Sequence, residues 1–272
     1  MRRVPARRKP SLAARADRAT LRSVELEGRV ALVTGASGRG MGRSIALTLA
    51  REGADLVVNC KERRDRAEEV AGVIEGMGRR ALVHQADVSD PAAVQAMVEA
   101  AEAQLGPLDI VVASAGGSWE PRDLPEIEPG AWRKVMAEEI DSVYLLLRAA
   151  LPGMRERGWG RIVIIGGYRA DDWRGGPPEA PLDYPLGKAA RHWLARTLGP
   201  RESKHGVTVN AVAPGPIDYI ELERARELVV GGLEAVEVLT PQHVAELVAF
   251  LCSERARFIT GAVIPVTGAR EV

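Results

Sequence analysis

Short apolar runs alternate with longer helical stretches from Gly28 onward, and this alternation constrains the fold more than any other feature of the chain. Apolar runs with the length of buried strands occupy residues 29–34, 54–59, 81–84, 109–113, 161–165, 207–212 and 262–266. Expected helices lie at residues 42–52, 64–77, 131–157 and 241–252, after Asp90-Pro91, and after Tyr184. Strands that are apolar on both faces and alternate with helices are typical of a parallel sheet covered on both sides. The sequence therefore predicts an α/β fold: one doubly wound parallel sheet of about seven strands with helices on both faces.

Composition excludes several function classes. The 272 residues are 46% hydrophobic and 27% charged, with zero net charge and a pI near 6.9. Nucleic-acid-binding domains usually carry a basic excess, so we expect no nucleic-acid partner. No apolar run reaches the roughly 20 residues that cross a bilayer, so we expect no membrane association and a cytoplasmic protein.

Residues 1–27 differ from the rest because they are rich in arginine and poor in acids. They lack the apolar core of a secretory signal. A disordered basic arm, a transit peptide and a start codon placed too early all fit, and the first and last are favoured. The predicted domain organisation is a basic, disordered arm over residues 1–27 and one doubly wound α/β domain over residues 28–272.

No metal site is expected. Cys60 and Cys252 lie far apart in different predicted elements and fit reduced thiols. The four histidines form no pair at ligand spacing, so we interpret them as structural or surface residues.

A glycine-rich loop, Thr34-Gly35-Ala36-Ser37-Gly38-Arg39-Gly40-Met41-Gly42, joins the first predicted strand to the first helix. Glycines at this point permit a tight turn and a close approach of the backbone to a pyrophosphate. The following helix N-terminus supplies amide donors. This loop predicts a dinucleotide-binding site at the carboxyl ends of the strands.

Tyr184 and Lys188 lie four residues apart in a predicted helix and therefore share one face. A lysine cation beside a tyrosine favours the phenolate, so we expect the pKa of Tyr184 to lie below its usual value of about 10. Such a tyrosine exchanges protons with a substrate oxygen. The pair is the candidate acid/base centre. Since Pro185 suits a first helical turn, the helix is expected to begin close to Tyr184.

Together these motifs resemble the short-chain dehydrogenase/reductase family from about Glu27 to the C-terminus. The resemblance rests on the glycine loop, Asp87-Val88, Ala115-Gly116, the Tyr184/Lys188 pair and the run from Asn210 to Ile217. It implies a Rossmann-type fold, a nicotinamide cofactor and a homotetramer or dimer built through helices 131–157 and 185–205.

The resemblance also implies residue roles. Tyr184 would be the acid/base, and Lys188 would bind the nicotinamide ribose and depress the pKa of the tyrosine. The cofactor-binding residues would be Gly35, Ser37, Arg39, Gly40, Met41, Gly42, Asn59, Asp87, Val88, Ala115, Gly116, Tyr184, Lys188, Pro214, Gly215 and Ile217.

The second strand ends in Asn59 rather than in an acid that would accept from a ribose 2′-hydroxyl. Arg39, Lys61 and Arg63 are placed to pair with a 2′-phosphate. The cofactor is therefore predicted to be NADP(H).

The chain departs from the family pattern at positions where the family has residues that take part in the reaction. Gly167 stands where the family has a substrate-binding serine, and Glu139 where it has a helix asparagine that supports a water relay to the lysine. Glu139 fits either a water-holding residue or, the favoured interpretation, a helix-surface residue. Replacements for the serine would come from Tyr168, Asp171, Asp172 or Asp183. Candidate substrate-lining aromatics are Trp119, Tyr168, Trp173 and Tyr219.

Three functions remain open. The first is NADP(H)-dependent reduction of a carbonyl, or oxidation of the alcohol, with Tyr184 as acid/base. The second is reduction of C=C or C=N, or a non-redox step, because a different reacting atom need not use the missing serine. The third is a non-catalytic NADP(H)-binding protein.

Overall fold

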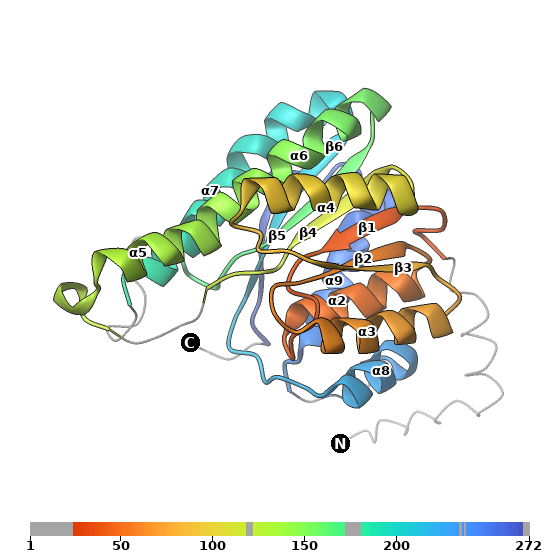
Figure 1. Cartoon of the computed structure of the whole chain (residues 1–272), viewed down its shortest axis with the longest axis horizontal. Coiled ribbons are helices and arrows are strands. Elements are labelled where there is room, and N and C mark those ends of the chain that lie inside the picture. The colour runs from red at the N-terminus through yellow and green to blue at the C-terminus, as the bar shows by residue number, and fades with distance from the viewer. Residues whose placement is uncertain (1–23, 118–121, 172–180, 234–235, 237, 269–272) are drawn as a thin grey trace, which may run out of the picture.

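Seven parallel strands form one sheet in the order β3-β2-β1-β4-β5-β6-β7 (Figure 1). The computed structural model describes residues 24–117, 122–171, 181–233, 236 and 238–268. The strands are β1 Val30–Val33, β2 Asp55–Cys60, β3 Ala81–Gln85, β4 Leu108–Ala113, β5 Gly160–Ile165, β6 Val207–Pro214 and β7 Val263–Val266. Strands β1, β4, β5 and β6 are buried along their whole length, as their continuous apolar runs predict. The predicted doubly wound sheet is confirmed.

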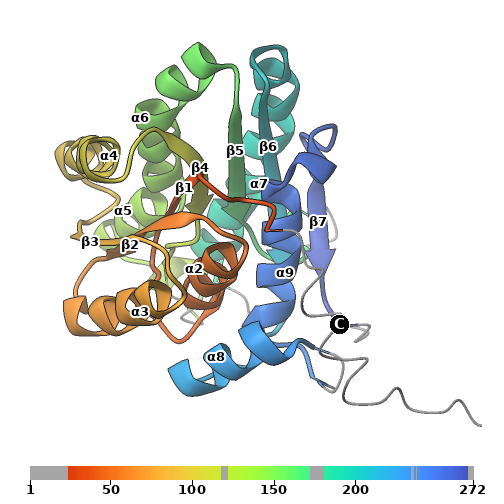
Figure 2. The same ribbon diagram turned by 90° about the vertical axis from the view of Figure 1, so that its right-hand side faces the viewer.

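Helices cover both faces of the sheet (Figure 2). One layer contains α2 Met41–Arg51, α3 Arg64–Gly76, α8 Leu222–Gly231 and α9 Pro241–Cys252. The opposite layer contains α4 Pro91–Gln104, α6 Ser142–Arg157 and α7 Asp183–Glu202, and α5 Pro129–Met136 packs against α7. The sequence predicted all of these helices except α8, which follows the segment after Ile217.

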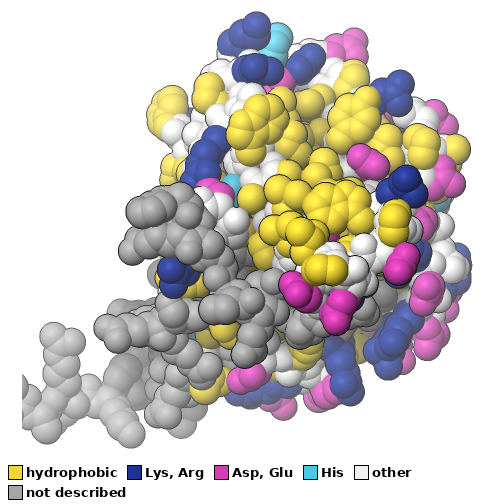
Figure 3. All heavy atoms as spheres, turned by 90° about the vertical axis from the view of Figure 1, so that its left-hand side faces the viewer, with side chains coloured by type: hydrophobic (Ala, Val, Ile, Leu, Met, Phe, Trp, Pro, Cys, Tyr) yellow, Lys and Arg dark blue, Asp and Glu magenta, His cyan; other side chains and the backbone are white. Residues whose placement is uncertain are grey.

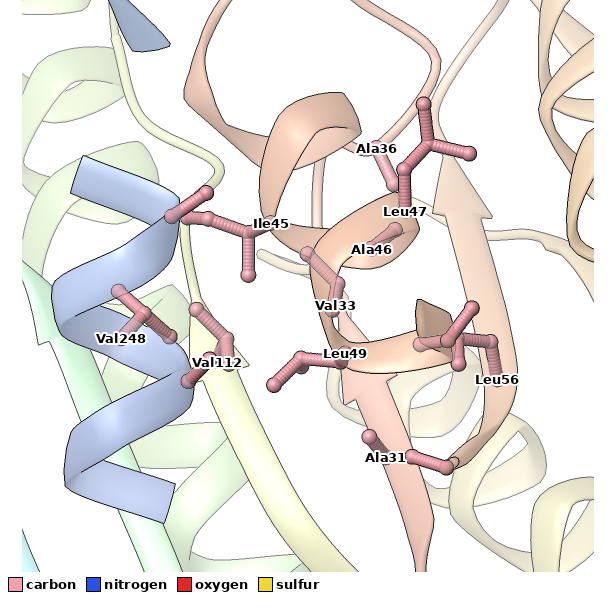
Figure 4. Packing of buried hydrophobic residues seen from close by; sticks show 14 of the residues in the cluster. Ala31, Val33, Ala36, Ile45, Ala46, Leu47, Leu49, Leu56, Val112 and Val248 are labelled. Atoms are coloured by element: carbon pink, nitrogen blue, oxygen red, sulfur yellow. The ribbon is translucent and has the colours of Figure 1, made fainter. Parts of the chain in front are cut away.

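Helix α2 packs on the sheet beside α9 in the same layer, and nine of its eleven residues are buried. Figure 4 shows Ile45 and Leu49 of α2 in one cluster with Val248 of α9 and the strand residues Val33 and Val112. Full burial of each large aliphatic side chain contributes about 1.5–3 kcal/mol. This packing fixes the N-terminus of α2, and with it the glycine loop, at the carboxyl end of the sheet.

The predicted helix 131–157 is interrupted by a π-helical turn, Ala137–Asp141, between α5 and α6. Such turns insert one extra residue into an α-helix and occur frequently at functional sites. Here the turn carries Glu139, the residue that we expected from the sequence to stand in place of a helix asparagine.

The described chain begins at Val24. Leu26 is buried, and its N–H donates to the carbonyl of Glu52, so the last residues of the predicted basic arm pack on the domain. The rest of that arm lies outside the described residues. Cys60 and Cys252 are buried free thiols.

Among the described residues, no helix is both long and apolar enough to cross a bilayer. Over the same residues, no group of three or more His, Cys, Asp or Glu side chains is placed to hold a metal ion.

Candidate active site

A cavity of about 650 Å³ opens at the carboxyl ends of β1 and β4, where the strand order reverses. The glycine loop and the Tyr184/Lys188 pair line the same cavity. The predicted site residues that line it are Gly35, Ser37, Arg39, Gly40, Met41, Gly42, Asn59, Asp87, Val88, Ala115, Gly116, Tyr184 and Lys188. Segments far apart in the sequence are thus brought together around one space.

The remaining predicted residues, Pro214, Gly215 and Ile217, are not among the residues that line the cavity. Pro214 ends β6, and Gly215 donates its N–H to the carbonyl of Val266. Ile217 packs against the core cluster beside α2 and α9.

The glycine loop needs its glycines for packing. Gly35 has a φ of +65°, which favours glycine, and a Cβ there would lie 3.2 Å from Cα of Ala115. A Cβ on Gly42 would lie 2.6 Å from the carbonyl oxygen of Gly35, closer than any real contact. The N-terminus of α2 therefore approaches the end of β1 closely enough to present its free N–H groups to the cavity.

Asn59 holds this loop in place. Its Oδ1 accepts from the N–H of Gly35 at 3.2 Å, and its Nδ2 donates to the carbonyls of His84 and Ala86 at 3.3 and 3.1 Å. The side chain is 1% exposed. Asn59 thus joins the loop to the end of β3. The charged residues that follow it and line the cavity are Lys61, Glu62, Arg63 and Arg66.

Two of the three cations predicted to bind a 2′-phosphate have protein partners. Lys61 lies 2.8 Å from Asp87 and 3.7 Å from Glu138, and Arg39 is ion-paired with Glu221. Arg63 lines the cavity without an ion pair to any described residue, and so does Arg66, which the sequence analysis missed. Arg66 lies one residue before the first buried position of α3, a spacing that could have indicated it.

Asp87 lies at the side of the cavity expected to border the adenine. Burial by itself would raise the pKa of this carboxyl, but hydrogen bonds from Lys61 and Ser89 outweigh it and lower the pKa to about 2. Asp87 is therefore ionised at neutral pH and holds the Lys61 ammonium.

Helix α7 begins at Asp183, so Tyr184 lies in its first turn, as Pro185 predicted. Asp183 is 1% exposed, accepts from the N–H of Tyr184 at 2.9 Å, and lies 3.2 Å from Arg122. An acid in the first turn complements the helix dipole. Asp183 is therefore committed to anchoring the helix start, which argues against the suggested substrate contact.

The Lys188 ammonium lies 5.1 Å from the centre of the Tyr184 ring, so the predicted pair is formed. Burial lowers the pKa of Lys188 to about 8, and the nearby Arg191 acts in the same direction. Burial raises the pKa of Tyr184 to about 12, and the charge of Glu139 adds to this rise. The expectation of a depressed tyrosine pKa is therefore wrong, because burial and a neighbouring carboxylate dominate.

Glu139 is fully buried, so the favoured surface interpretation is also wrong. Its Oε2 lies 3.0 Å from Lys188 Nζ and 2.8 Å from Arg191 Nε, and its Oε1 accepts from the N–H of Gly117 at 2.6 Å. Sequence analysis missed Arg191, although it lies three residues after Lys188 on the same face of α7.

The turn after β5 rests on a buried histidine. His192 Nε2 accepts from the N–H of Gly167 at 3.3 Å, and a Cβ on Gly166 would lie 2.2 Å from that nitrogen. His192 Nδ1 lies 2.9 Å from Asp171, which also pairs with Arg196. His192 is thus structural, as predicted.

The other candidate substrate contacts are dispersed. Tyr219 lines the cavity at the end formed by the glycine loop, where a Cβ on Gly40 would lie 3.3 Å from the Tyr219 ring. Tyr168 is half-buried, and its N–H donates to the carbonyl of Pro214. Trp119, Asp172 and Trp173 lie outside the described residues.

Comparison with known proteins gives consistent matches over nearly the whole chain. A family profile described as "Enoyl-(Acyl carrier protein) reductase" matches residues 35–268. The 3-oxoacyl-(acyl-carrier-protein) reductase FabG of Pseudomonas aeruginosa is 36% identical over 251 residues, which are 90% of this chain and 98% of that protein. The acetoacetyl-CoA reductase of Allochromatium vinosum is 33% identical, over 88% of this chain and 97% of that protein.

Solved structures agree. A dehydrogenase/reductase from Sinorhizobium meliloti superposes with a TM-score of 0.78 at 32% identity, covering 94% of this chain and all of that one. With the sheet order, the glycine loop and the Tyr184/Lys188 pair around one cavity, these matches show that the chain belongs to the short-chain dehydrogenase/reductase family of oxidoreductases.

Proposed function

We propose that the protein is an NADP(H)-dependent ketoreductase that uses Tyr184 as its proton donor. The observation that carries the proposal is the shared cavity: Tyr184 and Lys188 line the same 650 Å³ space as the glycine loop. The relatives FabG and acetoacetyl-CoA reductase are both named for reducing a 3-oxo group.

The residues fit this chemistry. A nicotinamide cofactor, when bound, supplies the hydride. The pKa of Tyr184, raised to about 12, keeps the phenol protonated at neutral pH, which suits donation of a proton to a carbonyl oxygen. Lys188 and the amides of the glycine loop would hold the ribose and pyrophosphate.

Preference for NADP(H) is supported by charge at the end of β2. Arg63 and Arg66 line the cavity without a partner among the described side chains, and they outnumber Glu62, the acid that lines it just after β2. Arg39 and Lys61 are near but ion-paired to Glu221 and Asp87.

A second candidate is reduction of a C=C bond. Gly167 at the position expected for serine favours it, because a β-carbon that accepts hydride needs no hydroxyl at that point. The matching family profile is itself described by an enoyl reductase. A ketone substrate instead requires another donor to the oxygen, since one missing donor typically costs about 3 kcal/mol of transition-state stabilisation.

The test is NADPH consumption over matched panels of ketones, enones and imines, with Tyr184→Phe alongside. We expect ketone turnover that falls by about 10²–10⁴-fold in the variant, the usual contribution of a general acid. Turnover confined to enones or imines would favour the second candidate. Bound NADPH without turnover on any panel would support a non-catalytic binding protein.

We further propose that the protein assembles with a second copy of itself through α6 and α7. Tyr144 of α6 and Leu186 and Trp193 of α7 are exposed, with Leu186 and Trp193 two helical turns apart on one face. Figure 3 shows hydrophobic side chains gathered on the side of the molecule where α5 and α7 lie. Light scattering should show a dimer or a tetramer. The substitution Trp193→Glu should shift the oligomeric state toward smaller species. A monomeric unaltered protein would refute this proposal.

A further inference from the structure

Three charged side chains share one buried site behind Tyr184. Lys188 Nζ and Arg191 Nε lie 3.0 and 2.8 Å from the same atom, Oε2 of Glu139. Glu139 and Arg191 have no exposed side-chain surface, and Lys188 has 7%. Each buried ion costs several kcal/mol of desolvation unless close opposite charges offset it. The three residues therefore form a unit in which each charge depends on the others.

The charges in this unit do not cancel. One carboxylate faces two cations, so the unit carries one net positive charge next to the phenol. Without Arg191, Glu139 would be neutralised by Lys188 alone, and no net cation would remain beside Tyr184. Without Glu139, two buried cations would repel each other.

Arg191 also joins the strand ends that frame the cavity. Its Nη1 donates to the carbonyl of Ile165 at 2.8 Å, and its Nη2 donates to that of Ala115 at 2.6 Å. Its Nε donates to the carbonyl of Glu139 at 2.8 Å. Ala115 precedes Gly116 of the cavity wall, and Ile165 precedes the Gly166-Gly167 turn. The planar guanidinium fork suits this simultaneous contact, which a lysine cannot reproduce.

We propose that Arg191 is a positioning residue for the reaction of this protein. It neutralises Glu139, keeps the Lys188 ammonium available to Tyr184, and ties the ends of β4 and β5 to the π-helical turn. The proposal rests on the proposed function. Arg191 does not line the cavity, so it acts through Glu139 and Lys188 rather than on a substrate.

Other ionisable groups lie around this unit, and the charged ones have partners of their own. Glu138 of the π-helical turn lies 3.7 Å from Lys61 and 4.0 Å from Lys134. On α7, His192 pairs with Asp171, and Asp183 pairs with Arg122. Tyr219 reaches the cavity from the segment before α8. Since these groups stay in place in every variant below, they act as a constant background.

The first test needs no cofactor and no substrate. The chain has five lysines, so NMR of ¹³C-labelled lysine can follow the Lys188 ammonium, whose pKa is about 8. Arg191→Met should raise the Lys188 pKa, because the lysine becomes the sole partner of Glu139. Glu139→Asn should lower it, because Arg191 then repels it unopposed. The double variant Glu139→Asn/Arg191→Met should fall between the two.

Chemical denaturation of the unaltered protein, the two single variants and the double variant forms a double-mutant cycle for stability. Each single variant leaves a buried charge less well compensated, whereas the double variant removes both, so the double should be more stable than the sum of the singles predicts. Arg191→Lys keeps the charge and loses the fork. It should leave the Lys188 titration near that of the unaltered protein and still lower kcat. This variant also serves if Arg191→Met does not fold.

The third readout is the pH dependence of alcohol oxidation, which requires the Tyr184 phenolate. The pH of half-maximal kcat/KM should rise by about one unit in Arg191→Met, the effect of losing one nearby buried charge, and return toward its original value in the double variant. An unchanged Lys188 titration in Arg191→Met, or strictly additive stabilities, would overturn the inference. Absence of Tyr184-dependent turnover in the unaltered protein would instead refute the proposed function, and the NMR titration would still decide the charge coupling.

Discussion

The two ends of the cavity are built in different ways. At the glycine-loop end, backbone forms the site: Gly35, Gly42 and the start of α2 follow one another in the sequence, and the Asn59 side chain accepts from the N–H of Gly35. At the tyrosine end, side chains form the site: Lys188 and Arg191 of α7, the helix that carries Tyr184, meet Glu139 from the distant π-helical turn. A contiguous backbone site is readable as a motif. A side-chain site tolerates substitution as long as its charges remain compensated, so its motif is less informative.

The largest effect is expected where backbone meets backbone. In Gly42→Val, a Cβ 2.6 Å from the Gly35 carbonyl oxygen has no flexible neighbour to displace, so the start of α2 must move. We expect cofactor affinity to fall by at least about 100-fold, since several N–H contacts are lost together. Calorimetric titration with NADPH measures this. Gly72→Ala, on α3 with nothing within 4 Å of its Cβ, is the control and should bind normally. Normal affinity in Gly42→Val would break the contrast between the two ends.

At the tyrosine end, Gly166→Ala should have a smaller and reversible effect. The Cβ of an alanine at position 166 would lie 2.2 Å from His192 Nε2. Because this neighbour is a side chain, a second substitution at His192 can remove it. We expect kcat/KM to fall by about 10–100-fold, as for a small misplacement of reacting groups, with NADPH affinity within about twofold of the original. The double variant Gly166→Ala/His192→Ala should regain part of the lost melting temperature. If the double is no more stable than Gly166→Ala, the histidine is not what the glycine accommodates.

Cofactor selectivity should depend on side chains even at the glycine-loop end. Arg66→Ala should weaken NADPH binding by about tenfold and leave NADH binding unchanged, because only the 2′-phosphate gives a charge-assisted contact. Arg64→Ala is a matched control, since Arg64 pairs with Glu68 and does not line the cavity. Dissociation constants for both cofactors measure this. Equal losses for NADPH and NADH in Arg66→Ala would rule out selectivity by this arginine.

The smallest effect concerns pH and stability at the Lys61–Asp87 pair. The pKa of Asp87 is lowered to about 2, so its contribution to stability is present above the unfolded value near 3.8 and is lost as pH falls from there toward 2. The Asp87 side chain is 36% exposed, which limits this contribution to about 1 kcal/mol or less. Urea denaturation at pH 6 and pH 3 should show a smaller loss of stability in Asp87→Asn than in the unaltered protein. An equal loss in both proteins would show that the pair contributes nothing.

Local sequence patterns were enough to predict most of the secondary structure and the glycine-loop end of the cavity. The period of the apolar residues, the glycines after β1 and Pro185 after Tyr184 each act within a few residues, so the strands, all helices but α8, and the helix start at Asp183 could be predicted. Helix α8 lies between Ile217 and Pro241, a segment for which the sequence analysis predicted no helix.

The tertiary structure alone decided the electrostatics. Sequence spacing gave Tyr184 a cationic neighbour and so predicted a depressed pKa, but it could not show that both groups are buried. Nor could it show that Glu139 turns inward at a π-helical turn, or that Arg191 reaches it across more than fifty residues. The sign of a pKa shift depends on burial and on every charge within a few ångströms. Those quantities exist only once the chain has folded.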